Sequence, residues 1–193
     1  MPGKGLLKIA TFAGSRALER GGQLVTGLLY GSAGVFSDSL TSRAGIPEAL
    51  QRLEEMVSLL NTHFLSFSPT ELEEASAPGK WSRKQLLGHL LDSAANNHRR
   101  FVLCQTEDGP HRMVAYQQDD WVRLGAYQAT PAADLLTFWT LYNQQLMRLI
   151  AQIPAEALSN QVIFENGYTV TLGWLIEDYA MHLEHHVRQI LQQ

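Results

Sequence analysis

Cysteine is almost absent from this chain, which carries only Cys104 among its 193 residues. A single cysteine cannot form an intrachain disulfide, and this usage fits a reducing compartment. Cys104 lies in an apolar helical segment, where a thiol is typical of a small core side chain and not of a nucleophile. We therefore expect a cytoplasmic protein that is held together by its core.

Long hydrophobic runs and an excess of positive charge are also missing. The longest window without charge, residues 21–37, is too short to span a bilayer and contains five glycines. The net charge of −4 leaves no basic stripe that could neutralise nucleic-acid phosphates. We therefore expect neither a membrane nor a nucleic acid as a partner.

The chain divides into two unequal parts. Its length and its 45% of hydrophobic residues suffice for one domain with a sizeable core. Residues 1–43 are rich in glycine and serine and lack a sustained helical stripe, so we interpret them as a weakly ordered leader or a mis-assigned start. Residues 46–193 have the pattern of a helical domain.

Helix signals recur through residues 46–193. The first helix is indicated by apolar residues at helical spacing: Leu50, Leu53, Val57, Leu60 and Phe64. The segments SPTE at residues 68–71 and SRKQ at residues 82–85 are capping boxes. The first predicts a short helical turn, and the second predicts a long helix that runs to about Gln105.

Two further helices follow after an irregular or short-helical region. Thr130, with a proline after it, is expected to cap a helix that ends before Pro154. Residues 159–171 alternate in polarity around an Asn-Gly pair, which predicts an extended excursion or a small hairpin. Thr171 then caps the last helix. The sequence predicts an all-α protein, a four-helix bundle with a long crossover connection and a small extended excursion before the last helix.

Three histidines stand close together on the last helix. At about 100° per residue, His186 falls on the apolar arc, His182 lies at its edge, and His185 points toward charged neighbours. His182 and His186 form an inward pair at a spacing of four, at which two imidazoles can bind one metal. Two inward-facing histidines on a helix are ordinary core residues about as often as they are metal ligands. Both interpretations therefore stay open here.

The helix after Trp81 carries a polar strip beside its apolar face. The strip comprises His89, Ser93, Asn96 and Arg100. Polar residues along the edge of a buried face are either solvated or line an internal cavity, and the spacing alone does not choose between these. His98 projects away from the strip and is expected to be exposed.

These motifs resemble those of a known family. The segments GKWSRKQLLGHLLDSAANNHRRF at residues 79–101 and DYAMHLEHHVRQI at residues 178–190 are similar to the DinB-like family of metal-binding four-helix proteins, in its YfiT-type branch. The resemblance covers about residues 46–193 and excludes the leader. It implies a ligand triad of His89, His182 and His186, three imidazoles that leave open positions on the metal.

The resemblance also implies a cofactor and a class of reaction. We expect one divalent metal, with zinc or nickel favoured over iron or manganese, and Asp178 as a residue that orients a ligand imidazole. Several family members join a low-molecular-weight thiol to an electrophile, so we expect a metal-dependent thiol S-transferase. The alternatives are a metal-dependent hydrolase and a non-catalytic metal-binding stress-response protein.

The expected partners are a small-molecule thiol and an electrophile. Asn96 and Arg100 are candidates for substrate binding, because Arg can hold a carboxylate with two hydrogen bonds. The alternative for Arg100 is a salt bridge to a nearby carboxylate. A homodimer is left open as the state of assembly.

Overall fold

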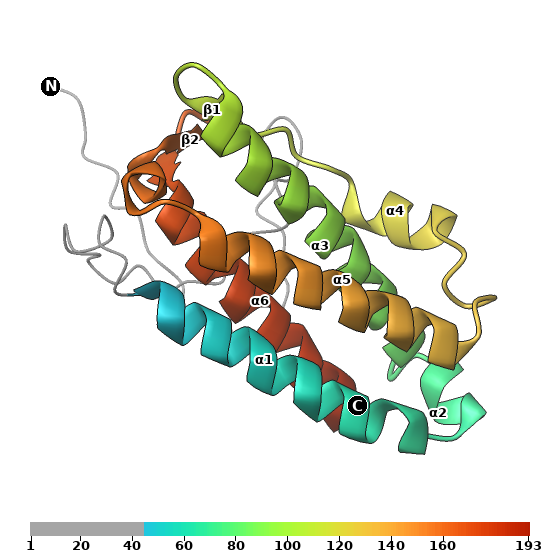
Figure 1. The fold of residues 1–193 in the computed structure, drawn as a ribbon. Helices are drawn as coiled ribbons and strands as arrows, with labels where there is room; N and C mark the ends of the chain where they lie inside the picture. Colours follow the sequence, from blue (N-terminus) through green and yellow to red (C-terminus); the bar gives the residue numbers. More distant parts are fainter. Residues whose placement is uncertain (1–44) are drawn as a thin grey trace, which may run out of the picture.

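Four long helices make up most of the described structure, a computed structural model that describes residues 45–193 (Figure 1). The interpretation of residues 1–43 as a leader lies outside the described residues. The helices are α1 (Gly45–His63), α3 (Arg83–Thr106), α5 (Ala132–Gln152) and α6 (Leu172–Gln192). The prediction of a helical bundle is confirmed.

The four helices are not arranged in chain order around the bundle. Helix α1 packs against α5 and α6, and α3 packs against the same two helices. The successive helices α1 and α3 therefore lie across the bundle from each other, as do α5 and α6. The long connections between helices make these diagonal crossings possible, and they bring α3 and α6 side by side.

Side-chain caps fix where several helices begin. Ser68 and Ser82 each form a complete capping box, the first at α2 (Pro69–Glu73) and the second at α3. Thr171 Oγ1 accepts a hydrogen bond from the Trp174 backbone at the start of α6. The prediction for Thr130 is wrong: Pro131 occupies the N-cap position of α5, and the Thr130 hydroxyl turns back to the Ala126 carbonyl.

The core is continuous along the bundle and draws on all four long helices. Its largest fully buried side chains include two aromatic residues on α5 and α6, Trp139 and Tyr179, and one on α3, Phe101. The Tyr179 hydroxyl donates a hydrogen bond to Asn143 Oδ1, so its one polar atom has a partner. Cys104 is buried in this core, as the sequence predicts.

A small sheet lies at one end of the bundle, and α2 lies at the other (Figure 1). Strands β2 (Gln161–Ile163) and β3 (Thr169–Thr171) form the predicted antiparallel hairpin, and the turn places Gly167 at a φ of 82°. Strand β1 (His111–Arg112), which was not predicted from the sequence, pairs with β2 in parallel. Two short 3₁₀ turns, η2 (Phe64–Ser66) and η3 (Ala155–Ser159), complete the connections.

The connection from α3 to α5 folds back along α3 and carries the short helix α4 (Gln118–Leu124). The Lys84 ammonium group anchors it by donating to the Gln128 carbonyl at 2.6 Å. Tyr127 donates its hydroxyl hydrogen to Asp92 Oδ1. The connection therefore covers one edge of α3 and takes polar residues there out of water. Within residues 45–193, no helix is long and apolar enough to cross a membrane.

Candidate metal centre

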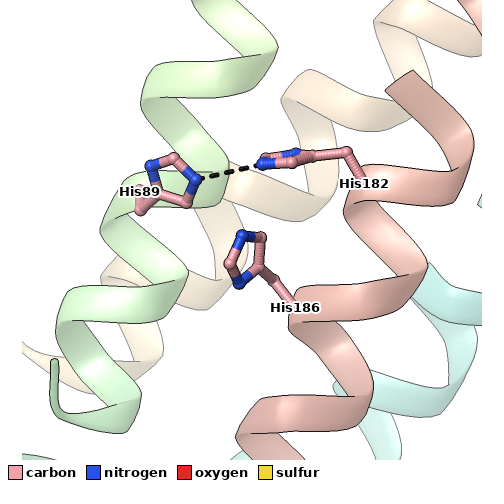
Figure 2. Close-up of side chains that lie close together, drawn as sticks. All are labelled: His89, His182 and His186. Atoms are coloured by element: carbon pink, nitrogen blue, oxygen red, sulfur yellow. Dashed lines mark hydrogen bonds between the residues drawn. The ribbon is translucent and has the colours of Figure 1, made fainter. Parts of the chain in front are cut away.

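Three imidazoles meet in the space between α3 and α6 (Figure 2). His89 comes from α3, and His182 and His186 come from successive turns of α6. Each offers one ring nitrogen, and these nitrogens all lie within 4.8 Å of one another. His89 and His182 are buried, while His186 is partly exposed. The structure thus brings together all three histidines that the sequence analysis proposed as ligands.

The nitrogen geometry fits a metal ion. His89 Nε2 lies 3.2 Å from His182 Nε2, as the dashed line in Figure 2 marks. For zinc bound to imidazole at 2.0–2.1 Å, tetrahedral geometry separates two ligand nitrogens by about 3.3 Å. The rings of His89 and His186 stand nearly perpendicular, with centroids 4.8 Å apart. Nitrogens that face each other this closely need a shared proton or a metal between them.

Two of the imidazoles are oriented through their second nitrogen. His186 Nδ1 donates to Gln189 Oε1 at 2.8 Å, which leaves Nε2 of that ring as the acceptor. His182 Nδ1 lies 3.4 Å from Ser93 Oγ. Hydrogen bonds of this kind fix the tautomer and the direction of a metal ligand. His89 Nδ1, in contrast, is buried without a hydrogen-bond partner among the described residues, and the Trp81 ring lies against His89 at a centroid distance of 4.9 Å.

The protonation of the cluster also suits a metal. Burial lowers the pKa of His89 to about 3 and that of His186 to about 4. Burial, followed by the neighbouring imidazoles His186 and His89, holds the pKa of His182 well below its ordinary value. All three rings are therefore neutral near neutral pH, which is the form in which imidazole binds a metal.

The other histidines stand apart from this cluster. His185 is exposed on α6, as its angular position predicts, although its ring touches that of His186. His98 was expected to be exposed and is instead partly buried, because its Nδ1 lies 3.0 Å from the Tyr142 hydroxyl on α5. His111 pairs with Glu107 at the end of α3.

The polar strip on α3 differs in one member from the prediction. Along this strip, His89, Ser93, Asn97 and Arg100 are buried; the other buried polar residues of α3 are Arg83, Lys84 and Asp92. Asn97 donates to the Ser93 carbonyl at 3.0 Å, and its Oδ1 lies 3.4 Å from the Arg100 guanidinium. Asn96 is partly buried and its amide donates to the Asp92 carbonyl, so its role in substrate binding stays a prediction.

Arg100 and Asp178 are both buried near the cluster. Arg100 is 5% exposed, and Asp178, one turn before His182, is 4% exposed. Burial lowers the pKa of Arg100, while the charge of Asp178 opposes this effect. No hydrogen bond joins Asp178 to the three imidazoles within residues 45–193, so its proposed role in orienting a ligand stays a prediction. Ser93 and Gln189, which the sequence analysis did not assign, orient two imidazoles; Gln189 could have been found from its spacing of three from His186.

The sequence profile of the DinB superfamily matches residues 50–190, which is most of the chain. The chain belongs to the DinB superfamily. Among its relatives within this superfamily is a protein of Oceanobacillus iheyensis named "Putative metal-dependent hydrolase OB0782", 26% identical over 145 residues, which are 75% of this chain and 83% of the relative. A protein of Bacillus mycoides with the same description, BcerKBAB4_2443, is also 26% identical over the same shares of both chains.

Two solved structures share the fold. YfiT from Bacillus subtilis is described as "a probable metal-dependent hydrolase with an unusual four-helix bundle topology"; it has a TM-score of 0.71 and 22% identity, over 78% of this chain and 86% of YfiT. A mycothiol-dependent maleylpyruvate isomerase has a TM-score of 0.61 and 15% identity, over 75% of this chain and 60% of the isomerase. Both likenesses confirm the predicted four-helix fold.

Proposed function

We propose that this DinB-superfamily protein is a metal-dependent thiol S-transferase, which joins a low-molecular-weight thiol to an electrophile. The observation that carries the proposal is a cluster of three neutral imidazoles together with a buried arginine whose charge acts on one of them. Within residues 45–193, no fourth histidine, cysteine, aspartate or glutamate joins the cluster. Three protein ligands leave room for an exogenous ligand, as in catalytic and not in structural metal sites.

The cluster would hold zinc or nickel, with iron or manganese as further candidates, because imidazole suits all of these ions. When bound there, a divalent metal stabilises a thiolate at neutral pH and so supplies the nucleophilic form of the thiol. The protein contributes three neutral imidazoles and fixes the orientation of their rings. Gln189 and Ser93 hold His186 and His182, and His89 is fully buried with the Trp81 ring against it.

Arg100 is the proposed binding residue for an anionic group of the substrate. Its side-chain contacts within the described part of the chain are long: 3.4 Å to Asn97 Oδ1 and 3.5 Å to the Val114 carbonyl. No ion pair within 4.0 Å neutralises it among residues 45–193. A buried guanidinium without such a pair is costly, and this favours an anionic ligand over the alternative of a structural salt bridge. Its charge also acts on His182, which places it within electrostatic range of the cluster.

The test compares two thiols on the metal-loaded protein. Thioether formation with 1-chloro-2,4-dinitrobenzene is measured with 3-mercaptopropionate, which carries a carboxylate, and with 2-mercaptoethanol, which is neutral. Arg100→Ala should keep the metal content and the helical circular dichroism, and should raise the KM for 3-mercaptopropionate by about 10–100-fold, the equivalent of a lost charge-assisted pair. The KM for 2-mercaptoethanol should change little. A loss of stability without this change in thiol preference would favour the salt bridge.

Hydrolysis is the second candidate, and the names of the relatives in Oceanobacillus and Bacillus favour it. The same three ligands can lower the pKa of a bound water. The transferase needs a thiol for activity and the hydrolase does not, so an assay without thiol distinguishes them. A hydrolase would cleave p-nitrophenyl acetate without added thiol, and the loss of His89 would abolish this cleavage. A protein that binds the metal but accepts neither thiol nor ester would fit the non-catalytic stress-response alternative.

A further inference from the structure

Asp178 is buried without a structural partner. Its side chain is 4% exposed, and its Oδ2 is shielded from solvent without a hydrogen bond. Within residues 45–193, no hydrogen bond or ion pair reaches either carboxylate oxygen, and Asp178 lies well inside α6 and caps no helix end. A buried carboxylate in this state destabilises the fold. Such a residue points to a role in the chemistry of the neighbouring site.

Asp178 lies one helical turn from His182, a member of the candidate metal centre. It precedes His182 by four residues on α6, and both are buried. Residues at this spacing have Cβ atoms about 6 Å apart on one face of the helix. From α3, the charge of Arg100 acts on both Asp178 and His182. The carboxylate, the guanidinium and the ligand imidazole thus occupy one buried region between α3 and α6.

We propose that Asp178 is the proton acceptor for the thiol that binds at the three histidines. This inference rests on the proposed transferase function. The S–H bond breaks, the electron pair stays on sulfur, and the proton goes to Asp178 Oδ2. Sulfur then forms a bond to the electrophilic carbon as the bond to the leaving group breaks with its electron pair. The proton passes from Asp178 to the leaving group or to solvent, so charge and atoms balance.

The surroundings of Asp178 suit reversible proton transfer. Burial raises the pKa of its carboxyl to about 7, and the positive charge of Arg100 opposes that rise. An acceptor with a pKa near the working pH is effective in both taking and returning a proton. If the carboxylate of a thiol substrate pairs with Arg100, it offsets the field of Arg100 on Asp178. Substrate binding therefore strengthens Asp178 as an acceptor at the moment at which the thiol proton has to leave.

Asp92 is the other buried carboxyl near the cluster, and it serves as a matched control. It lies one turn after His89 on α3, and its Oδ2 also lacks a hydrogen-bond partner among the described residues. Its other oxygen accepts the hydrogen bond of Tyr127, which ties the connection from α3 to α5 down onto α3. Asp92 thus has a structural role that Asp178 lacks, and we assign the thiol proton to Asp178.

The experiment counts protons released when 3-mercaptopropionate binds to the zinc-loaded protein. Calorimetric titrations in two buffers of different ionisation enthalpy give this number for wild type, Asp178→Asn and Asp92→Asn. At about pH 8, most of the thiol is still protonated in solution, so thiolate binding liberates close to one proton per site. Wild type and Asp92→Asn should release clearly less than one proton, because the substrate carboxylate on Arg100 raises the pKa of Asp178 further and this residue keeps part of the thiol proton. Asp178→Asn, which keeps the shape of the side chain, should release nearly all of it.

A cobalt(II)-loaded sample reports thiol binding independently through its thiolate-to-metal absorption band. If the band forms and Asp178→Asn releases no more protons than wild type, Asp178 is not the acceptor while the transferase proposal stands. If only Asp92→Asn loses the uptake of the thiol proton, Asp92 is the proton acceptor and the proposal is wrong. If wild type shows no band, thiol chemistry at this site is wrong, and the inference falls with it.

Discussion

The Gln189 side chain holds the His186 ring from one turn further along α6, with Oε1 at 2.8 Å from Nδ1. Because this oxygen can only accept a hydrogen, it selects the tautomer that leaves His186 Nε2 free for a metal. We therefore propose Gln189 as a positioning residue of the candidate metal centre, although it is only partly buried and offers no ligand itself.

Removal of that acceptor should weaken metal binding more than it weakens the fold. Gln189→Ala is expected to lower zinc affinity by about 10–100-fold, the usual effect of losing a group that orients a ligand. The measurement is competition with a chromophoric chelator, with thermal unfolding of the metal-free protein alongside. Gln192→Ala, on the same helix but exposed, is the control and should leave the affinity unchanged. Equal losses in both variants would show a general effect on the end of α6.

The ligand assignment itself predicts a sharp division among the histidines. Single alanine replacements of His89, His182 and His186 should each remove most of the bound metal, because two imidazoles hold an ion far more weakly than three. His185→Ala and His98→Ala should retain it, and His98→Ala should cost about 1 kcal/mol of stability through its lost hydrogen bond to Tyr142. Metal content is measured by elemental analysis of the purified variants. Equal metal loss from His185→Ala would contradict the assignment.

The helices and the inward-facing histidine pair on α6 could be predicted because their signals are local. Capping boxes such as Ser82–Gln85 define a start within four residues, and the spacing of four between His182 and His186 places both on one face. The contribution of His89 followed from the resemblance to the DinB-like family. The structure adds that His89 Nε2 comes within 3.2 Å of His182 Nε2.

Features that depend on distant segments could not be predicted. Strand β1 has two residues and forms only because β2 lies beside it. Asp92 would be solvated on an isolated α3, and it is buried because the connection that carries Tyr127 covers it. Asn97 lies inside the apolar arc of α3, where an amide was not expected, and its hydrogen bond to the Ser93 carbonyl compensates for its burial.

Arg83 ties the end of α6 to the start of α3 and should be a major source of stability. Its guanidinium is buried, stacks on Phe67 at 4.2 Å, and donates to the carbonyls of Ile190 and Glu71, each at 2.9 Å, and to that of Gln193. Arg83→Ala should lower the free energy of unfolding by about 3 kcal/mol, because it leaves several carbonyls unpaired. Arg83→Lys should recover only part of this stability, since one ammonium group cannot reproduce the planar set of hydrogen-bond donors of a guanidinium.

Urea denaturation of the metal-free protein provides the measurement for Arg83. The control is Arg123→Ala, which removes only an exposed pair with Asp120 and should change stability by less than about 1 kcal/mol. A similar small change for Arg83→Ala would mean that the end of α6 is held by the core alone.

The Tyr127 ring packs directly against the backbone of Gly88, which is possible because glycine has no side chain. A Cβ atom at position 88 would overlap the Tyr127 ring, so Gly88→Ala should displace the connection between α3 and α5 and destabilise the protein by about 2 kcal/mol. A double-mutant cycle with Tyr127→Ala tests the cause by urea denaturation. The combined variant should be more stable than the sum of the single effects predicts, because the overlap no longer exists. Strict additivity would place the damage elsewhere.

The Asp92 carboxyl should give the metal-free protein a pH-dependent stability. Burial raises its pKa from 3.8 to about 6, and the hydrogen bond from Tyr127 opposes that rise. Because the folded state holds the proton more tightly than the unfolded chain does, the stabilisation is fully present below pH 3.8 and is lost as the pH rises through about 6. Asp92→Asn cannot ionise, so its stability advantage over wild type should grow across this interval and then level off, at most about 3 kcal/mol. Urea denaturation at a series of pH values measures this difference. Tyr127→Phe removes the opposing hydrogen bond and should move the titration midpoint of Asp92 to higher pH. If the gain in stability of Asp92→Asn does not depend on pH, the Asp92 carboxyl is not protonated in the folded protein.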